Sequence, residues 1–200
     1  METLLDIPFA EEAALWLGAY LIGSVSFGYL LLRATGHGDI RTRGSKGTGA
    51  TNALRIAGKA AGAAVLAGDF AKGAIPVALA LAYGGNGTAL LVASGIFFGH
   101  LFPCWLAFKG GKAVASLIGI TLVLDWRIAV VFCICWVVVA GITRYSSLAS
   151  LASVVIMPAS AFLLDANQFV LPSAVAALFV VYAHRANIGR LRNGVENKII

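Results

Sequence analysis

Long apolar runs separated by short polar segments dominate this chain. Residues 13–32 form a run of twenty without a charged side chain. As a helix this run would extend about 30 Å, which matches the thickness of a bilayer core. Several later runs are shorter than the roughly 17 residues of a full span, so some short or broken helices are expected. The pattern predicts seven helices, at about residues 13–32, 60–83, 88–108, 113–124, 128–143, 148–164 and 169–183.

The composition shows where these helices reside. The chain is 60% hydrophobic and only 12% charged, whereas a globular protein carries about 25% charged residues. A soluble chain of this size buries only about 70% of its surface on folding, so the excess apolar side chains require lipid. We therefore predict an all-α, polytopic membrane protein with a single transmembrane domain over residues 1–200.

The basic residues give the expected orientation. Segments 33–59, 109–112, 144–147 and 184–200 hold thirteen of the fifteen Lys and Arg residues, and the opposite side holds six of the nine acids. Because cytoplasmic loops of membrane proteins are enriched in Lys and Arg, the N-terminus is expected outside and the C-terminus in the cytoplasm. An even number of helices would destroy this asymmetry, which supports the count of seven.

The four inner segments concentrate groups that bind anions. Segment 33–59 contains six glycines and six basic residues against one acid, and 108–112 reads Phe-Lys-Gly-Gly-Lys directly before a predicted helix. Glycine amides, a helix N-terminus and a lysine can together hold a phosphate. Taken singly, these segments fit equally well with loops that set topology or touch anionic lipid. Together, they favour a phosphate-bearing ligand held in one pocket at the inner leaflet.

Other features narrow the chemistry. Carboxylates are scarce on the inner side, so no metal ion and no other cofactor are expected. No nucleic-acid-binding module is visible despite the net charge of +6. Asp69 and Lys72, spaced i and i+3 within an apolar run, are interpreted as a buried structural ion pair. His100, near Pro103, could serve either a site or helix packing.

Several short motifs follow one another along nearly the whole chain: Gly23–Tyr29, Asp39–Arg41, Gly44–Ser45, Gly49–Asn52 with Arg55, Gly99–Pro103, Phe108–Lys112 and His184–Ile188. In this order they resemble the bacterial acyl-phosphate:glycerol-3-phosphate acyltransferase family of integral membrane enzymes, called PlsY. Three positions depart from the family pattern: Gly47, where the family usually has Asn, Ala113, where it usually has Gly, and Ser116, where it usually has Thr.

The resemblance implies a reaction and a set of site residues. The 1-hydroxyl of sn-glycerol 3-phosphate would attack an acyl phosphate, giving lysophosphatidic acid and phosphate in phospholipid biosynthesis. The enzyme would lie in the bacterial cytoplasmic (inner) membrane among membrane lipids, act as a monomer and face its site to the cytoplasm. The implied catalytic residues are Ser45, Lys112, His184 and Asn187, and the implied substrate-binding residues are Thr51, Asn52, Arg55, Gly110, Gly111, Ser146 and Ser147.

The proton acceptor and one rival function remain open on sequence alone. His184 or a phosphate oxygen of a substrate could take the hydroxyl proton. The substrate is favoured, because no carboxylate in the sequence is placed to orient His184. The rival function is a transporter or flippase for an organophosphate or an anionic lipid. Such a protein needs polar residues near the middle of the membrane, whereas this chain places nearly all of them on one side.

Overall fold

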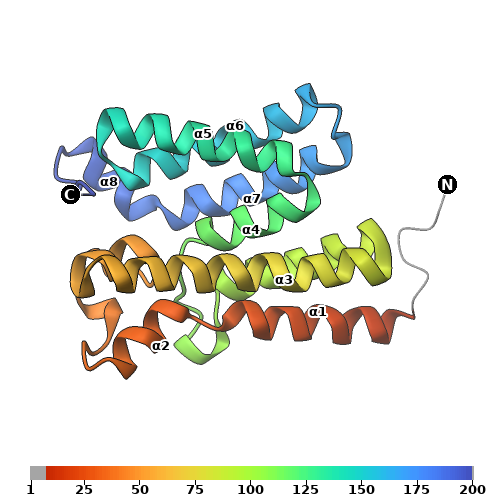
Figure 1. Cartoon of the computed structure of the whole chain (residues 1–200), viewed down its shortest axis with the longest axis horizontal. Coiled ribbons are helices and arrows are strands. Elements are labelled where there is room, and N and C mark those ends of the chain that lie inside the picture. Colours follow the sequence, from red (N-terminus) through yellow and green to blue (C-terminus); the bar gives the residue numbers. More distant parts are fainter. Residues whose placement is uncertain (1–7, 200) are drawn as a thin grey trace. The chain divides into compact units, whose positions relative to one another are not determined.

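The computed structural model describes residues 8–199, and this part of the chain contains only helices and connecting turns (Figure 1). The all-α prediction is therefore confirmed for the described residues. Glu2 and Asp6, two of the acids used to predict orientation, lie outside them. The helices are α1 (Phe9–Ser24), α2 (Phe27–Ala34), η1 (Ile40–Thr42), α3 (Ala50–Leu101), η2 (Cys104–Leu106), α4 (Val114–Leu124), α5 (Trp126–Thr143), α6 (Ser146–Leu163), η3 (Asn167–Phe169), α7 (Val170–Ala183) and α8 (Arg185–Arg192).

The chain divides into two compact units, Met1–Leu124 (unit 1) and Asp125–Ile200 (unit 2), which are described separately. Unit 1 begins with a broken helix rather than the continuous one predicted for 13–32. Extended backbone at Val25 and Ser26 separates α1 from α2, with a bend of 41°. The Lys72 ammonium donates to the Val25 carbonyl at 2.6 Å, so the break has a bonding partner inside the unit.

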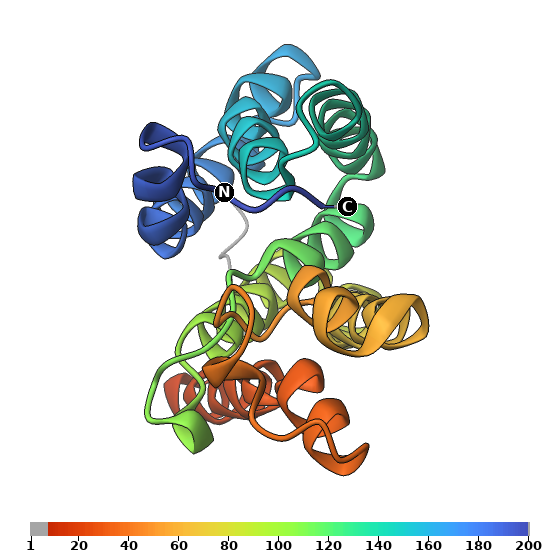
Figure 2. The ribbon, with the colours of Figure 1, turned by 90° about the vertical axis from the view of Figure 1, so that its left-hand side faces the viewer.

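Helix α3 is long because two predicted helices join with hardly any connector. Gly58 and Gly85 interrupt its 52 residues with φ of 83° and 72°, in the left-handed region that glycine adopts without steric cost. Figure 1 shows the chain of α3 running out and then returning, and Figure 2 shows its two arms end-on. The contacts with α1 give the directions of the arms on either side of Gly85: Lys72 of the first arm meets the end of α1, whereas Gly95 and Gly99 of the second follow Trp16 and Tyr20 in the same direction.

The third predicted helix ends earlier than expected, at Leu101 instead of residue 108. Pro103 follows, and because proline cannot donate a backbone hydrogen bond it ends the helix there. Residues 104–106 then form the short turn η2. The segment up to residue 113 is irregular, and α4 packs antiparallel on the first arm of α3, where Gly73 and Gly119 allow close backbone contact.

Unit 2 is built around α6, which packs against both α5 and α7. Asp125 caps α5 by accepting a hydrogen bond from the Arg127 amide at 3.0 Å. At the other end of the unit, α7 stops at Ala183 and α8 starts at Arg185 with a bend of 61°. His184 therefore lies at a bend, and residues 184–191 do not continue α7 as a straight helix.

The helices have the apolar length that a membrane protein needs. By length and composition, three described helices could each cross a bilayer, and each of the two bent pairs could add one more. Helix α4 is a shorter apolar helix of 11 residues. The apolar surface of α5 is largely exposed, as expected for a helix that faces lipid.

Candidate active site

Asn52 organises the loop that precedes α3. Its Oδ1 accepts a hydrogen bond from the Ser45 amide at 2.9 Å, and its Nδ2 donates to the carbonyls of Ile40, Arg43 and Gly47 at 2.8–3.1 Å. The side chain is 2% exposed. Asn52 was predicted to bind substrate, but these contacts support an indirect role, in which it fixes the backbone that carries Ser45.

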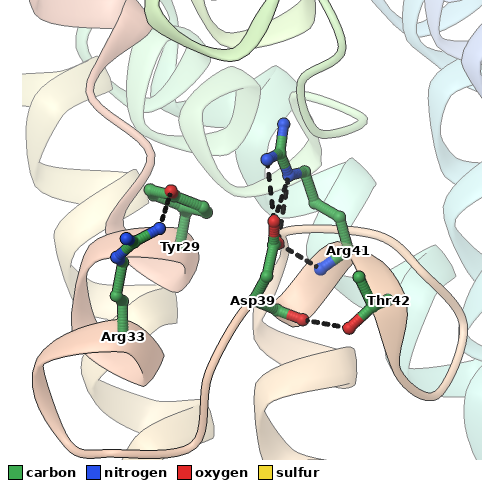
Figure 3. Close-up of polar contacts among 5 residues, drawn as sticks. All are labelled: Tyr29, Arg33, Asp39, Arg41 and Thr42. Carbon is green, nitrogen blue, oxygen red and sulfur yellow. Dashed lines mark hydrogen bonds and ion pairs between the residues drawn. The ribbon is translucent and has the colours of Figure 1, made fainter.

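A second set of contacts holds residues 39–42, the earlier part of the same loop (Figure 3). The Asp39 carboxylate accepts from the backbone amide of Arg41 and from its guanidinium, at 2.7–3.2 Å. These side-chain hydrogen bonds are the main reason that the pKa of Asp39 lies below its ordinary value. Arg41 also stacks over the Tyr29 ring, 5.0 Å from its centroid, and Arg33 donates to the Tyr29 hydroxyl. The loop is thus tied to α2.

The Gly110–Gly111 pair does not present its amides to an anion as predicted. The Gly110 amide donates to the Leu101 carbonyl at 3.2 Å, and the Gly111 amide donates to the His100 carbonyl at 3.1 Å. Both donors are used inside the protein, so these contacts do not support the predicted use of the amides for an anion. The glycines are needed for close approach instead. A Cβ at Gly110 would clash with the His100 carbonyl oxygen, and one at Gly111 would clash with the His100 Nε2.

Lys112 follows this pair, two residues before α4 begins, and is half-buried. Ala113 has φ of 57° and is fully buried. For a residue other than glycine the left-handed region costs about 1 kcal/mol or more. The departure from the usual family glycine therefore falls at a left-handed backbone position. The Ala113 carbonyl accepts from the Leu117 amide at 2.8 Å and so begins α4.

The predicted site residues of unit 1 lie on adjoining segments. The Thr48 hydroxyl would be 3.1 Å from a Cβ at Gly111, so the loop that holds Ser45 abuts the segment that holds Lys112. Thr51 and Arg55 lie in the first turns of α3, directly after this loop, and both are half-buried.

Glu196 joins two of the predicted site residues of unit 2, Ser147 and Asn187. Its Oε1 accepts hydrogen bonds from the Ser147 hydroxyl at 2.9 Å and from the side-chain amide of Asn187 at 2.6 Å. Its Oε2 pairs with Arg190 Nε at 2.6 Å. The Ile199 amide then donates to the Arg144 carbonyl, which returns the end of the chain to the start of α6. Ser146 is the first residue of α6. Ser147 and Asn187, 40 positions apart, thus share one carboxylate oxygen.

Sequence reasoning missed Glu196 as a partner shared by the predicted site residues. Burial raises the pKa of this carboxyl, but the hydrogen bonds from Asn187, Arg190 and Ser147 outweigh it, and the net shift is downward. Its only sequence signal was that it is the sole acid in the basic segment 184–200. A single carboxylate among many donors is a good candidate for a shared acceptor.

His184 is held in a defined tautomer. Its Nδ1 lies 2.8 Å from the Val180 carbonyl oxygen, which can only accept, so Nδ1 carries a proton. In the neutral ring Nε2 therefore has the lone pair and can accept a hydrogen bond. The Val180 carbonyl therefore helps to orient the ring. The imidazole is 98% buried, consistent with a fixed orientation.

Comparison with known sequences identifies the family. Residues 13–194 match the family described as glycerol-3-phosphate acyltransferase. This chain belongs to that family. Similar relatives bear the same name: one from Mesorhizobium japonicum is 46% identical over 180 residues (90% of this chain, 92% of the relative), and one from Rhodopseudomonas palustris strain BisB5 is 46% identical over 187 residues (94% and 95%).

Solved structures agree with this family assignment. The acyltransferase resembles PlsY, described as an integral membrane glycerol 3-phosphate acyltransferase, in its glycerol 3-phosphate form, with a TM-score of 0.88. The two are 32% identical, over 94% of this chain and 95% of that one. The lysophosphatidic acid form of PlsY matches with a TM-score of 0.85 and 31% identity. The predicted resemblance to the family is confirmed, and the protein is an acyltransferase of the membrane-integral type.

Within residues 8–199, no three His, Cys, Asp or Glu side chains are grouped so that they could hold a metal ion. The side chains offered by the predicted site are hydroxyls, amides, an imidazole and cations. Such groups bind and position phosphates and can neutralise charge that develops during acyl transfer.

Proposed function

We propose that this acyltransferase moves a fatty acyl group from acyl phosphate to the 1-hydroxyl of sn-glycerol 3-phosphate. The hydroxyl oxygen forms a bond with the acyl carbon, the bond from that carbon to the phosphate oxygen breaks, and inorganic phosphate leaves. The products are lysophosphatidic acid and phosphate, at the start of phospholipid biosynthesis. The observation that carries the proposal is family membership across residues 13–194, supported by the glycerol 3-phosphate and lysophosphatidic acid forms of the structural relative.

In unit 1, Lys112 and Arg55 would bind the phosphate of glycerol 3-phosphate, and Ser45 and Thr51 would add hydroxyl donors. Cations make the stronger, charge-assisted hydrogen bonds to phosphate. The support is the way unit 1 holds these residues: Asn52 fixes the backbone at Ser45, and the Gly110–Gly111 turn fixes the backbone before Lys112.

In unit 2, Asn187 and His184 would contact the reacting groups, and Ser146 would bind the acyl phosphate. Ser147, whose hydroxyl hydrogen goes to Glu196, would line the same part of the site. Acyl phosphate is already activated, so the enzyme contributes mainly positioning and charge neutralisation. We assign the hydroxyl proton to a phosphate oxygen of the substrate and give His184 Nε2 the task of orienting the attacking hydroxyl. The neutral tautomer set by Val180 supports this role.

We further propose seven membrane spans, the N-terminus outside, the C-terminus in the cytoplasm and an active site that opens to the cytoplasm of a bacterium. The two arms of α3 count separately because Gly85 reverses the chain, and α1 with α2 counts as one broken span. Helix α4 would be a short span. Basic residues on segments 33–59 and 184–200 support the orientation. The enzyme would act as a monomer.

The donor assay tests the reaction directly. Purified protein is given labelled glycerol 3-phosphate with palmitoyl phosphate and, in parallel, with acyl-CoA or acyl-carrier protein. We expect labelled lysophosphatidic acid from palmitoyl phosphate alone. Product from either other donor at a similar rate would contradict the acyl-phosphate assignment, and uptake of label into vesicles without acylated product would indicate the transporter.

Lys112→Ala tests the phosphate site. We expect a loss of about 1.5–3 kcal/mol, typical of a hydrogen bond to a charged group, seen mainly as a higher KM for glycerol 3-phosphate. The matched control is Lys109→Ala, since Lys109 is an exposed lysine three positions away. Steady-state kinetics with each substrate varied in turn measures the effect. Unchanged kinetics in Lys112→Ala would remove this residue from the site.

A further inference from the structure

A buried polar cluster in unit 1 contacts residues 111–113, the segment that contains Lys112, and has no part in the reaction proposed above. It consists of Asp69, Lys72, His100 and Ser116, each at most 6% exposed. The Lys72 ammonium pairs with Asp69 at 2.8 Å, and His100 Nδ1 lies 3.9 Å from the same Asp69 oxygen. His100 Nδ1 also lies 3.1 Å from the Ser116 hydroxyl.

The hydrogen-bond directions within this cluster follow from the acceptors. Ser116 Oγ lies 3.1 Å from the Ala113 carbonyl oxygen, which can only accept, so the single hydroxyl hydrogen goes to Ala113. The remaining contact requires His100 Nδ1 to donate to the Ser116 oxygen. The nearby Asp69 carboxylate favours this arrangement, because its negative charge attracts the N–H group.

His100 thereby holds the backbone on both sides of Lys112, directly at Gly111 and through Ser116 at Ala113. On one side its carbonyl accepts a hydrogen bond from the Gly111 amide at 3.1 Å, and its ring packs so closely that a Cβ at Gly111 would clash with Nε2. On the other side its Nδ1 holds Ser116, which holds the Ala113 carbonyl. Residues 111 and 113 are thus tied to one histidine, and Lys112 is the residue between the two ties.

We propose that His100, through Ser116, is a positioning residue that fixes the backbone of Lys112 for binding the phosphate of glycerol 3-phosphate. The proposal rests on the proposed function of Lys112. Ala113 explains why such a tie is needed: its left-handed backbone is strained, and without the Ser116 bond the segment gains freedom to relax. The Asp69–Lys72 pair in turn fixes the environment of the His100 ring and bonds the broken end of α1.

Ser116 gives the sharpest test, because the chain offers graded variants. Ser116→Ala removes the tie and should raise the KM for glycerol 3-phosphate about fivefold, as expected for loss of one hydrogen bond, while the KM for palmitoyl phosphate changes less than about twofold. Ser116→Thr keeps the hydroxyl, which can still reach the carbonyl in the preceding turn, and should behave as the unaltered protein. The matched control is Ser153→Ala, which removes an equally buried hydroxyl bonded to the Ala149 carbonyl in α6.

A double variant separates positioning from a general role in folding. If Ser116 acts through Lys112, Ser116→Ala should have no further effect on the KM for glycerol 3-phosphate in a Lys112→Ala background. His100→Leu, which removes the Nδ1 donor, should raise this KM as Ser116→Ala does, and His100→Asn, which keeps a donor at that position, should raise it less. Melting in detergent is recorded for every variant, and the Ser116 series decides the question if His100→Leu does not fold.

The outcomes are distinct. A rise confined to glycerol 3-phosphate, rescued by threonine and absent in the Lys112→Ala background, supports the proposal. An unchanged KM in Ser116→Ala, an equal rise for both substrates, or the same rise in the Lys112→Ala background would overturn it. Failure of Lys112→Ala itself to raise this KM would instead overturn the phosphate role of Lys112.

Discussion

His184→Ala is expected to lower kcat about a hundredfold, the size of effect seen when a reacting group loses its alignment. The alanine removes the Nε2 acceptor that would orient the hydroxyl of glycerol 3-phosphate, while the phosphate contacts of Lys112 are kept. The KM for glycerol 3-phosphate should therefore change much less than kcat. Steady-state assays with palmitoyl phosphate measure both parameters, and His37→Ala, at a half-buried histidine outside the proposed site, serves as the control.

His184→Gln distinguishes orientation from proton abstraction. Glutamine can accept a hydrogen bond but cannot take a proton near neutral pH, so a role in orientation predicts that the glutamine variant retains clearly more activity than the alanine variant. The opposite outcome is that both variants lose the same activity and that the pH dependence of kcat seen in the unaltered protein is absent from both. In that case His184, and not the substrate phosphate, accepts the hydroxyl proton as the general base.

Glu196→Gln is expected to destabilise unit 2 and to reduce activity together. The substitution removes the charge that Ser147, Asn187 and Arg190 share, and hydrogen bonds to a charged group contribute about 1.5–3 kcal/mol each. We expect a lower melting temperature in detergent at neutral pH and at least a tenfold loss of kcat/KM. Asp165→Asn, at an exposed carboxylate of the same unit, is the control.

The pH dependence of stability checks the same cluster. Because the folded-state pKa of Glu196 is lowered, its contribution is complete above the unfolded value of about 4.3 and is lost as the pH falls through the folded pKa. The difference in melting temperature between the unaltered protein and Glu196→Gln should therefore shrink below about pH 4. A difference that stays constant down to that pH would show that the charge of Glu196 does not stabilise the cluster.

The hydrophobic pattern was sufficient for the helical class and for most of the elements, because apolar length is what a bilayer demands. It could not place the breaks. The interruption at Val25 and Ser26 has its bonding partner in Lys72, 47 positions away, which donates to the Val25 carbonyl. The reversal at Gly85 needs a single left-handed residue, and many glycines in this chain do not reverse it.

The motifs located the candidate residues but not the use of each polar atom. A Gly-Gly-Lys sequence before a helix suggests free amides, yet the irregular backbone after Pro103 brings the His100 and Leu101 carbonyls to those amides. Asn52 likewise looks like a ligand-binding side chain until its four loop contacts are seen. These uses depend on segments that meet only in the folded protein, so local sequence does not reveal them.

Residues 193–199 form a C-terminal strap that returns to Arg144, and this return has a practical consequence for handling the protein. Residues 193–199 are joined to the start of α6 by the Ile199 amide and to α8 by Glu196. An affinity tag joined without a spacer directly to residue 199 would begin beside the Arg144 carbonyl and close to the serines at the start of α6. A flexible glycine-serine extension before the tag would leave the strap in place during purification.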